Sequence, residues 1–224
     1  MNKLVIIPIC DFFDCIYTIV SFYLKNLDEA DIIIVTDGVR DNTEWLQGSI
    51  QKNCIIIRNS KPGNLRNAIY SAYKYMQKSR SYDLVITNEH DVIPNEDSLY
   101  ACLHVFEDKK AMRGMASVST VYKWNGKDCY PSHPNWYNGW TVLNGYGVGE
   151  CKIAAAQGIP FGFALWKPEI IDLLNNKDLP LIWKLDSRFG ELVYSKGYHH
   201  IRLVDYYVEH YKQGVKSWKN ISTF

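Results

Sequence analysis

Through the first half of the chain, short and mainly apolar segments alternate with segments that have the pattern of helices. Four runs are almost free of polar residues, as strands buried on both faces of a sheet are, and they lie at 4–9, 31–35, 53–57 and 84–87; a fifth predicted strand lies at 116–121. Three segments between them are predicted helices, at 16–27, 65–78 and 97–107. The alternation predicts an α/β fold with right-handed β-α-β units and a mainly parallel, Rossmann-like central sheet flanked by helices.

The second half of the chain loses this rhythm. Residues 122–157 are rich in Gly, Trp, Tyr and Asn, and a long segment of this kind inside a compact domain is usually functional or disordered. Order returns with predicted helices at 168–175 and 185–196 and a predicted strand at 201–208. The 224 residues are enough for one core and too few for two ordinary domains, so we predict a single domain, 1–224, with an irregular C-terminal half.

Composition narrows the class of protein. With 47% hydrophobic and 22% charged residues the chain is globular, and a net charge of +1 gives no electrostatic reason for nucleic-acid binding. The longest apolar stretch, 15–24, is too short to cross a bilayer, which takes about 20 apolar residues, and the acids Asp11 and Asp14 argue against a secretory signal. None of the six cysteines forms a Cys-x-x-Cys pair, which favours free thiols in a reducing compartment. We therefore predict a cytoplasmic protein without a transmembrane segment.

Acidic residues follow three of the predicted strands. Asp11 comes after the first, Asp37 after the second, and Glu89 and Asp91 after the fourth. Ligands of open parallel sheets bind beyond the carboxyl ends of the strands, so these acids are candidates for a binding site. Any one of them alone is typical of a loop cap, whereas three together favour a site.

The triplet Glu89-His90-Asp91 carries the strongest chemical signal. Two carboxylates that leave a buried strand at positions i and i+2 can both turn toward one cation, and hard oxygen ligands suit Mg²⁺ or Mn²⁺. Such an ion neutralises the charge that builds on a departing diphosphate. The alternative is a solvated turn before Pro94, since an acid-x-acid triplet also occurs by chance.

Several segments together resemble glycosyltransferase family 2, whose members have the GT-A fold. The N-terminal matches are LVIIPICD, which resembles the opening strand, GNLRNAIYSAY, which resembles the Arg-Asn helix, and DLVITNEHDVIPNEDSL, which resembles the strand, DxD motif and following helix. In the C-terminal half, residues 158–163 resemble the glycine-aromatic segment on the acceptor side. Leu185-Asp186 resembles the Glu-Asp helix start, and 208–211 resembles the late strand that ends in a His.

The sequence departs from the family pattern at three positions. Glu89 stands where the first Asp of the DxD motif is usual, Leu185 replaces the Glu before the catalytic Asp, and Thr36 replaces the first of two acids after the second strand. These differences leave a neighbouring GT-A family open.

The resemblance implies a nucleotide-sugar-binding half at about 1–105 and an acceptor-binding and catalytic half at about 106–224. It implies transfer of a sugar from a nucleotide sugar, with a UDP-sugar favoured, to a glycan or other hydroxyl acceptor, with inversion and with Mn²⁺ or Mg²⁺ as cofactor. The residues that it assigns to the donor are Pro8, Ile9, Asp11, Asp37, Arg66, Glu89 and Asp91. The residues that it assigns to the metal are Asp91, Glu89 and His210.

The same resemblance makes Asp186 the candidate general base, since inversion by direct displacement needs a carboxylate to take the proton of the acceptor hydroxyl. The alternative is an acid that stabilises a helix N-terminus through the helix dipole. Four further residues are candidates for acceptor binding, through aromatic faces or through backbone at a glycine: Trp124, Trp136, Trp140 and Gly162. The alternative for the tryptophans is a small hydrophobic cluster.

Two other classes of protein remain as alternatives. A sugar-phosphate nucleotidyltransferase shares the layered layout and the divalent metal, but it has a Gly-rich, Arg-containing loop after the first strand, and PICDFFDC has no glycine. A non-catalytic carbohydrate-binding protein uses tryptophans in the same way, but it has no need of Asp37, Asp91 and His210 together.

Overall fold

The computed structural model of the protein describes most of the chain, in the ranges 1–9, 15–36, 50, 54–58, 65–108, 114–124, 127–128, 137–143, 151–156, 161–181 and 185–211. The N-terminal strands are β1 (Lys3–Ile9), β2 (Ala30–Thr36), β3 (Ile55–Arg58), β4 (Leu84–Asn88) and β5 (Val92–Ile93). The later strands are β6 (Met115–Trp124), β7 (Lys127–Asp128), β8 (Tyr137–Leu143), β9 (Cys151–Ala156), β10 (Phe163–Trp166) and β11 (His199–His210). The helices are α1 (Ile16–Asn26), α3 (Leu65–Met76), α4 (Glu96–Glu107), α5 (Pro168–Ile171), the 3₁₀ helix η2 (Asp172–Asn175) and α6 (Leu185–Ser195).

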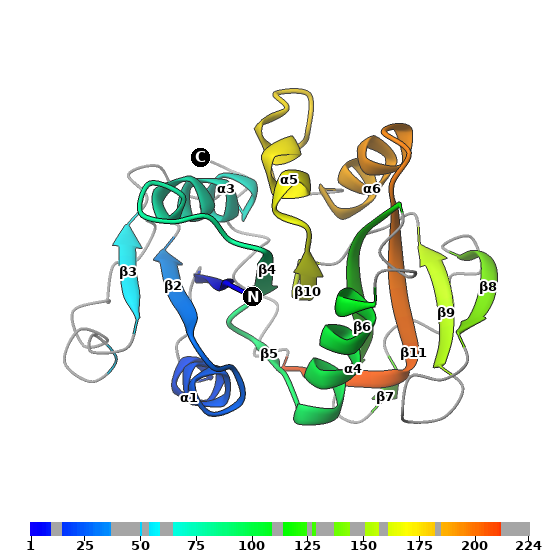
Figure 1. The fold of residues 1–224 in the computed structure, drawn as a ribbon, viewed down its shortest axis with the longest axis horizontal. Helices are drawn as coiled ribbons and strands as arrows, with labels where there is room; N and C mark the ends of the chain where they lie inside the picture. The colour runs from blue at the N-terminus through cyan, green and yellow to red at the C-terminus, as the bar shows by residue number, and fades with distance from the viewer. Residues whose placement is uncertain are drawn as a thin grey trace.

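One curled sheet runs through the whole molecule (Figure 1). Its strand order is β3-β2-β1-β4-β10-β6-β11-β9-β8, with β5 paired to β11 and β7 paired to β6. The first four strands of that order are parallel neighbours, as the sequence predicts, because α1 and α3 carry the chain back across the sheet between them. The α/β fold class predicted from the sequence is therefore confirmed.

The C-terminal half differs from the irregular segment that we predict. Residues 122–157 contain β7, β8, β9 and the end of β6. β10 then enters the sheet antiparallel to both β4 and β6, which makes the sheet as a whole mixed.

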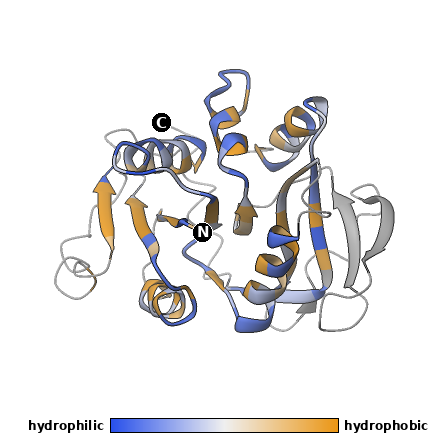
Figure 2. Cartoon of the chain, in the orientation of Figure 1, coloured by the Kyte–Doolittle hydropathy of each residue, from blue (hydrophilic) through white to orange (hydrophobic). Residues whose placement is uncertain are grey.

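Helices cover both faces of the sheet and bury two hydrophobic clusters. One cluster joins α1 and α4 to one face, and the other joins α3, α5 and α6 to the opposite face. β1 supplies both clusters, since Leu4 and Ile6 pack into one and Val5 and Ile7 into the other. Figure 2 shows β3 as hydrophobic nearly to its tip, although its residues are exposed or only partly buried. β1, β2 and β4, in contrast, are buried over most of their length. This two-sided burial explains why the strands read as unbroken apolar runs.

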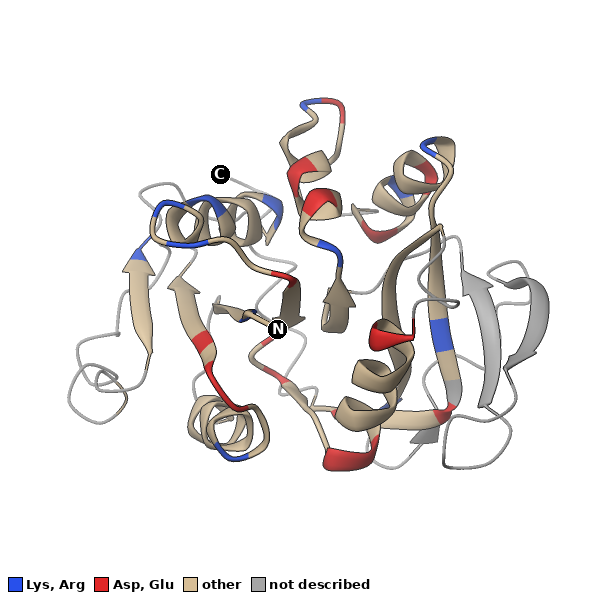
Figure 3. Ribbon diagram, viewed as in Figure 1, with Lys and Arg blue, Asp and Glu red and all other residues tan. Residues whose placement is uncertain are grey.

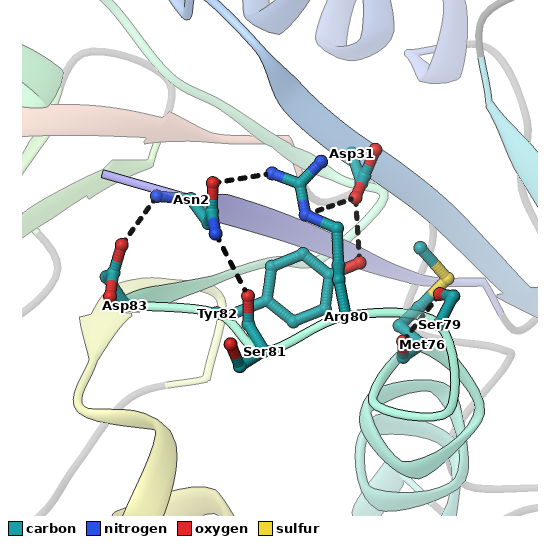
Figure 4. Close-up of polar contacts among 8 residues, drawn as sticks. All are labelled: Asn2, Asp31, Met76, Ser79, Arg80, Ser81, Tyr82 and Asp83. Carbon is teal, nitrogen blue, oxygen red and sulfur yellow. Dashed lines mark hydrogen bonds and ion pairs between the residues drawn. The ribbon is translucent and has the colours of Figure 1, made fainter.

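A polar network closes the sheet at the amino ends of β1 and β4 (Figure 4). The backbone N–H of Asn2 donates to Asp83 Oδ2 at 2.7 Å, and Arg80 donates to Asn2 Oδ1 at 3.0 Å. Tyr82 and Arg80 both reach Asp31 on β2, at 2.7 Å and 3.4 Å. The network ties three strands together at the edge opposite their carboxyl ends, which leaves the carboxyl edge for a ligand.

Among the residues that the structure describes, no helix has both the length and the apolar character needed to cross a membrane. None of the three cysteines that are described with their surroundings, Cys15, Cys54 and Cys102, is in a disulfide bond.

Candidate active site

The acidic triplet forms a tight loop between β4 and β5 at the carboxyl edge of the sheet. The backbone N–H of Glu89 donates to the carbonyl of Gly162 at 2.8 Å, and the N–H of Val92 donates to the carbonyl of Glu89 at 3.1 Å. The N–H of Tyr211 donates to the carbonyl of Asp91 at 2.7 Å. These bonds join the loop to β10 on one side and to the end of β11 on the other.

His210 lies directly against Asp91. Its Nε2 is 3.1 Å from Asp91 Oδ2, and the two side chains are only 21% and 23% exposed. The pairing arises because β5 and β11 are antiparallel neighbours, with Val92 opposite His210. Burial opposes ionisation of Asp91, but the hydrogen bond to His210 and the nearby His90 outweigh it, so the pKa of Asp91 is lowered.

The second oxygen of Asp91 lacks such a partner. Oδ1 is buried and makes no hydrogen bond to any of the residues that the structure describes. A buried carboxylate oxygen without a donor costs free energy, and such atoms are normally paired with a donor or with a bound ion. The arrangement therefore fits a cation beside Asp91.

Glu89 and Asp186 complete a group of three carboxyl groups. Burial raises the pKa of Glu89 well above its usual value, and the negative charges of Asp91 and Asp186 raise it further. Asp186 lies in the first turn of α6, and burial raises its pKa to about 7, while the charge of Arg202 opposes that rise. Acids brought together in a partly buried site in this way are typical of catalytic centres and metal sites.

The described residues contain no cluster of three or more His, Cys, Asp or Glu side chains with the geometry of a metal site. An ion such as Mg²⁺ is commonly held by one or two carboxylates, with phosphate oxygens and water in the remaining positions. Asp91, with Glu89 and His210 beside it, provides the one or two carboxylates that such an ion needs from the protein.

Gly162 lies against the same loop, as its carbonyl bond to Glu89 shows. A side chain there would collide with its neighbours, since an added Cβ would lie 2.9 Å from Tyr122 Oη and 3.2 Å from Val92 Cγ2. The Tyr122 hydroxyl in turn accepts a hydrogen bond from the Phe163 N–H at 2.6 Å. Gly162 thus allows β10 to approach the acidic loop closely.

The other predicted donor residues lie elsewhere along the edge. Pro8 and Ile9 end β1 beside Val35 and Thr36 of β2, and Ile9 is buried in the core. Arg66 lies in the first turn of α3, and its guanidinium donates to the carbonyls of Asn176 and Leu179 at 3.0 Å and 2.6 Å. These bonds tie α3 to the segment after η2, and a nucleotide contact of Arg66 stays a prediction.

Some predicted residues fall outside the description. Asp11, Asp37 and Trp136 lie outside the described residues. Trp124 ends β6 and Trp140 lies in β8, and only their backbone is described. The roles that we predict for these five residues stay predictions.

β11 carries two buried polar residues, Arg202 and His200, to which the sequence assigns no role. Both are 1% exposed, and Arg202 is the one Lys or Arg of β11, which Figure 3 marks as a basic band across the strand. The imidazole of His200 lies between Ser117 Oγ at 2.7 Å and Ser119 Oγ at 2.9 Å. Burial, followed by the nearby Arg202 charge, lowers the pKa of His200 well below its usual value. The signal in the sequence was a charged residue inside an otherwise apolar run, Ile201 to Val204.

No protein-family model matches the sequence, and no curated protein matches it either. Solved structures do match. A mannosyltransferase, PcManGT from Pyrobaculum calidifontis in complex with GDP-Man and Mn²⁺, superposes with a TM-score of 0.62 at 14% identity, over 96% of this chain and 58% of that chain. GalNAc-T7 with UDP, GalNAc and Mn²⁺ superposes with a TM-score of 0.68 at 10% identity, over 96% of this chain and 44% of that one.

This chain has the GT-A fold. A mycobacterial protein also superposes, with a TM-score of 0.58 at 12% identity, over 96% of this chain and 68% of that chain. The chain spans about half the length of the first two structures. In the GT-A domain described here, the group formed by Glu89, Asp91, Asp186 and His210 lies at the carboxyl ends of β4 and β11 and at the start of α6.

Proposed function

We propose that this GT-A domain is a metal-dependent glycosyltransferase that moves a sugar from a UDP-sugar to an acceptor hydroxyl with inversion. The observation that carries the proposal is the buried Asp91 Oδ1, which lacks a hydrogen bond among the described residues while His210 holds the other oxygen. A cation beside Oδ1 would satisfy an atom that the protein leaves unpaired there.

The two transferase structures support the proposal at the level of the fold. PcManGT was solved with GDP-Man and Mn²⁺, and GalNAc-T7 with UDP, GalNAc and Mn²⁺. Identities of 14% and 10% leave the reaction of this chain to be argued from its own residues. Both donors are nucleotide sugars or parts of one, and the choice of UDP here rests on the resemblance of Asp37 to a uracil-binding acid.

Asp91 and His210, with Glu89 beside them, are the residues that would hold the ion. When bound, a divalent cation supplies positive charge that stabilises a departing diphosphate. The ion would also favour the ionised form of Glu89, because its charge offsets the repulsion that Asp91 and Asp186 exert on that carboxyl group.

Asp186 is the proposed base. A carboxylate in this role takes the proton of the acceptor hydroxyl as that oxygen attacks the anomeric carbon. A pKa of about 7 makes it a stronger base than an exposed Asp, and the positive charge of Arg202 limits the rise enough for ionisation near neutral pH. Trp124, Trp136, Trp140 and Gly162 are proposed to line the acceptor side, and the cytoplasmic location also stays a prediction.

An assay of UDP-sugar breakdown tests the proposal. A transferase supplied with Mn²⁺ and a UDP-sugar, but no acceptor, should release UDP slowly as water takes the place of the acceptor. A carbohydrate-binding protein should release none. A nucleotidyltransferase should instead form a UDP-sugar from UTP and a sugar 1-phosphate. Absence of UDP release across a panel of UDP-, GDP- and dTDP-sugars, with and without simple sugar acceptors, would contradict the proposal.

A further inference from the structure

Asn88, the last residue of β4, is fully buried, and both the oxygen and the nitrogen of its side-chain amide form hydrogen bonds. It is 0% exposed, and its Oδ1 accepts a hydrogen bond from the Tyr23 hydroxyl at 2.7 Å. Its Nδ2 donates to two carbonyls, that of Glu89 at 2.7 Å and that of Val92 at 2.8 Å. One amide group therefore joins α1 to both ends of the acidic loop.

The two carbonyls that Asn88 binds enclose the residues that would hold the metal. Glu89 starts the loop, Val92 follows it, and Asp91 lies between them. The Glu89 carbonyl also accepts from the Val92 N–H at 3.1 Å, so the side chain of Asn88 strengthens a turn that already closes on itself. Because the Asn88 amide binds both carbonyls, the backbone of the loop has little freedom, and the two carboxylates that it carries cannot easily move apart.

Tyr23 fixes which way the amide faces. A hydroxyl that donates to Oδ1 selects the orientation in which the amide nitrogen points at the loop. An Asp at this position would keep the acceptor for Tyr23 but would offer at most one donor to two carbonyls. A buried carbonyl without a donor would then push the loop into another conformation.

We infer that Asn88 is a positioning residue for the metal site, and that its amide sets the separation of the Glu89 and Asp91 carboxylates through the backbone of their loop. The inference rests on the proposed function, because it assumes that these acids bind a divalent cation. Asn88 touches neither the ion nor the substrate. Its effect is exerted through the two carbonyls.

Binding of Mn²⁺, measured by the loss of the free Mn²⁺ signal in electron paramagnetic resonance, tests this directly without requiring turnover. The titration uses the full chain, with and without UDP, for the wild type and for Asn88→Asp. We expect Mn²⁺ affinity in the presence of UDP to fall by about 10- to 100-fold, the usual effect of losing a residue that orients metal ligands.

Thr87→Val is the matched control. Thr87 is the preceding residue of the same strand, it is also buried, and its hydroxyl accepts a hydrogen bond from Trp166 Nε1 at 2.9 Å on the other side of the sheet. This variant should lower the melting temperature while keeping the wild-type affinity for Mn²⁺. If Asn88→Asp lowers only the melting temperature, as Thr87→Val does, Asn88 is a structural residue and the inference is wrong.

If Asn88→Asp does not fold, the variant Tyr23→Phe tests the role of Asn88 instead. It removes only the bond that orients the amide, so Mn²⁺ affinity should fall by less than in Asn88→Asp but still below the wild-type value. Wild-type affinity in folded Tyr23→Phe would overturn the inference. A wild-type chain that binds no Mn²⁺ with or without UDP would instead overturn the proposed function, and the inference with it.

Discussion

Asp91 presents its two oxygens to different surroundings. Oδ2 faces His210 at 3.1 Å, whereas Oδ1 is buried without a hydrogen bond from the described residues. Glu89, two residues earlier, has a raised pKa, and Asp91 has a lowered one. Of the two acids, Asp91 is therefore the one whose surroundings favour the ionised form that a cation needs.

This asymmetry predicts unequal effects of neutralising the two acids. Asp91→Asn should abolish transfer, because it removes the charge nearest to the proposed ion, and Glu89→Gln should reduce transfer less. Steady-state rates at saturating Mn²⁺ and donor measure both effects, with melting temperatures as the check on folding. A larger loss in Glu89→Gln than in Asp91→Asn would reverse the two roles.

Asp186 predicts the pH dependence of the reaction. A base must be ionised, so with a pKa of about 7 the transfer rate should rise with pH up to about 7 and then level off. Asp186→Asn should keep donor affinity and lower the transfer rate by roughly 10²- to 10⁴-fold, with the pH dependence lost. If Asp186 only stabilises the start of α6, its loss should cost about 0.3–1 kcal/mol of stability and leave the rate of folded protein near normal.

The same pKa has a consequence for stability. Burial raises the pKa of Asp186 from 3.8 to about 7 in the folded state, so between those values the folded protein binds more protons than the unfolded chain. The contribution of this residue to stability therefore falls as the pH rises through that window. Asp186→Asn lacks the effect, so its melting temperature should gain on that of the wild type as the pH rises from about 4 to about 7.

At the scale of elements, the bend in β11 brings His210 to the acidic loop. Leu203 pairs with Thr120 of β6, but Tyr207 pairs with the next residue, Val121, so β11 carries extra residues at 204–206. Figure 1 shows the strand changing direction before it reaches β5. Extra residues of this kind bend a strand and re-aim the side chains beyond them. The start of α4 holds the bend, since Asn95 and Ser98 both donate to the carbonyl of Tyr207.

Asn95 therefore has two functions, and substitution can separate them. Its Oδ1 caps α4 by accepting from the Ser98 N–H at 2.9 Å, while its Nδ2 reaches Tyr207. Asn95→Ala should lose about 1 kcal/mol from the cap and about as much again from the bond to Tyr207, as measured by urea unfolding. Asn95→Asp keeps the cap and loses only the second bond, so it should lose about half as much. Equal losses in the two variants would show that the bond to β11 carries the whole effect.

At the scale of the whole molecule, one sheet brings the two halves of the chain together. β10, from the C-terminal half, lies between β4 and β6, and β11 lies beyond β6. Among the proposed donor residues that the structure describes, Pro8 and Ile9 end β1, Arg66 lies in α3, and Glu89 and Asp91 follow β4, whereas Asp186 and His210 come from α6 and β11. A donor with its cation bound at this edge would contact both halves and would favour the folded chain.

UDP should therefore stabilise the protein only when Mn²⁺ or Mg²⁺ is present, because a diphosphate bound at the proposed site would lie beside carboxylates that repel it. A ligand at about 100 times its dissociation constant adds about 2.7 kcal/mol to the free energy of unfolding. Melting curves with UDP, with and without Mn²⁺, measure this, and samples in EDTA serve as the control. Equal stabilisation by UDP in EDTA would remove the metal role, whereas a preference for GDP or dTDP would remove only the uracil role of Asp37.

Local patterns in the sequence predict most of the strands and helices, and they place the acids at the ends of strands. Apolar runs predict β1, β2, β3 and β4, and the segments 116–121 and 201–208 predict β6 and β11. The runs of β1, β2 and β4 are apolar at consecutive positions because these strands are buried on both faces. The family resemblance assigns Glu89, Asp91 and His210 to the metal and Asp186 to the base. The structure brings these four residues close to one another.

The pairing of the strands and the side chains that support the site become apparent only in the folded chain. The antiparallel entry of β10 and the bend of β11 depend on pairing between distant segments, which local patterns do not encode. Asp91 and His210 are 119 residues apart, and Arg202 affects Asp186 only because α6 packs beside β11. In the sequence, Asn88 is an ordinary polar residue at the end of a predicted strand. Its hydrogen bonds to the two loop carbonyls form only when the loop takes its folded conformation. The pattern of apolar residues indicates which positions are buried, because burial depends on each residue in turn. Hydrogen bonds between distant segments depend instead on the register in which the strands pair.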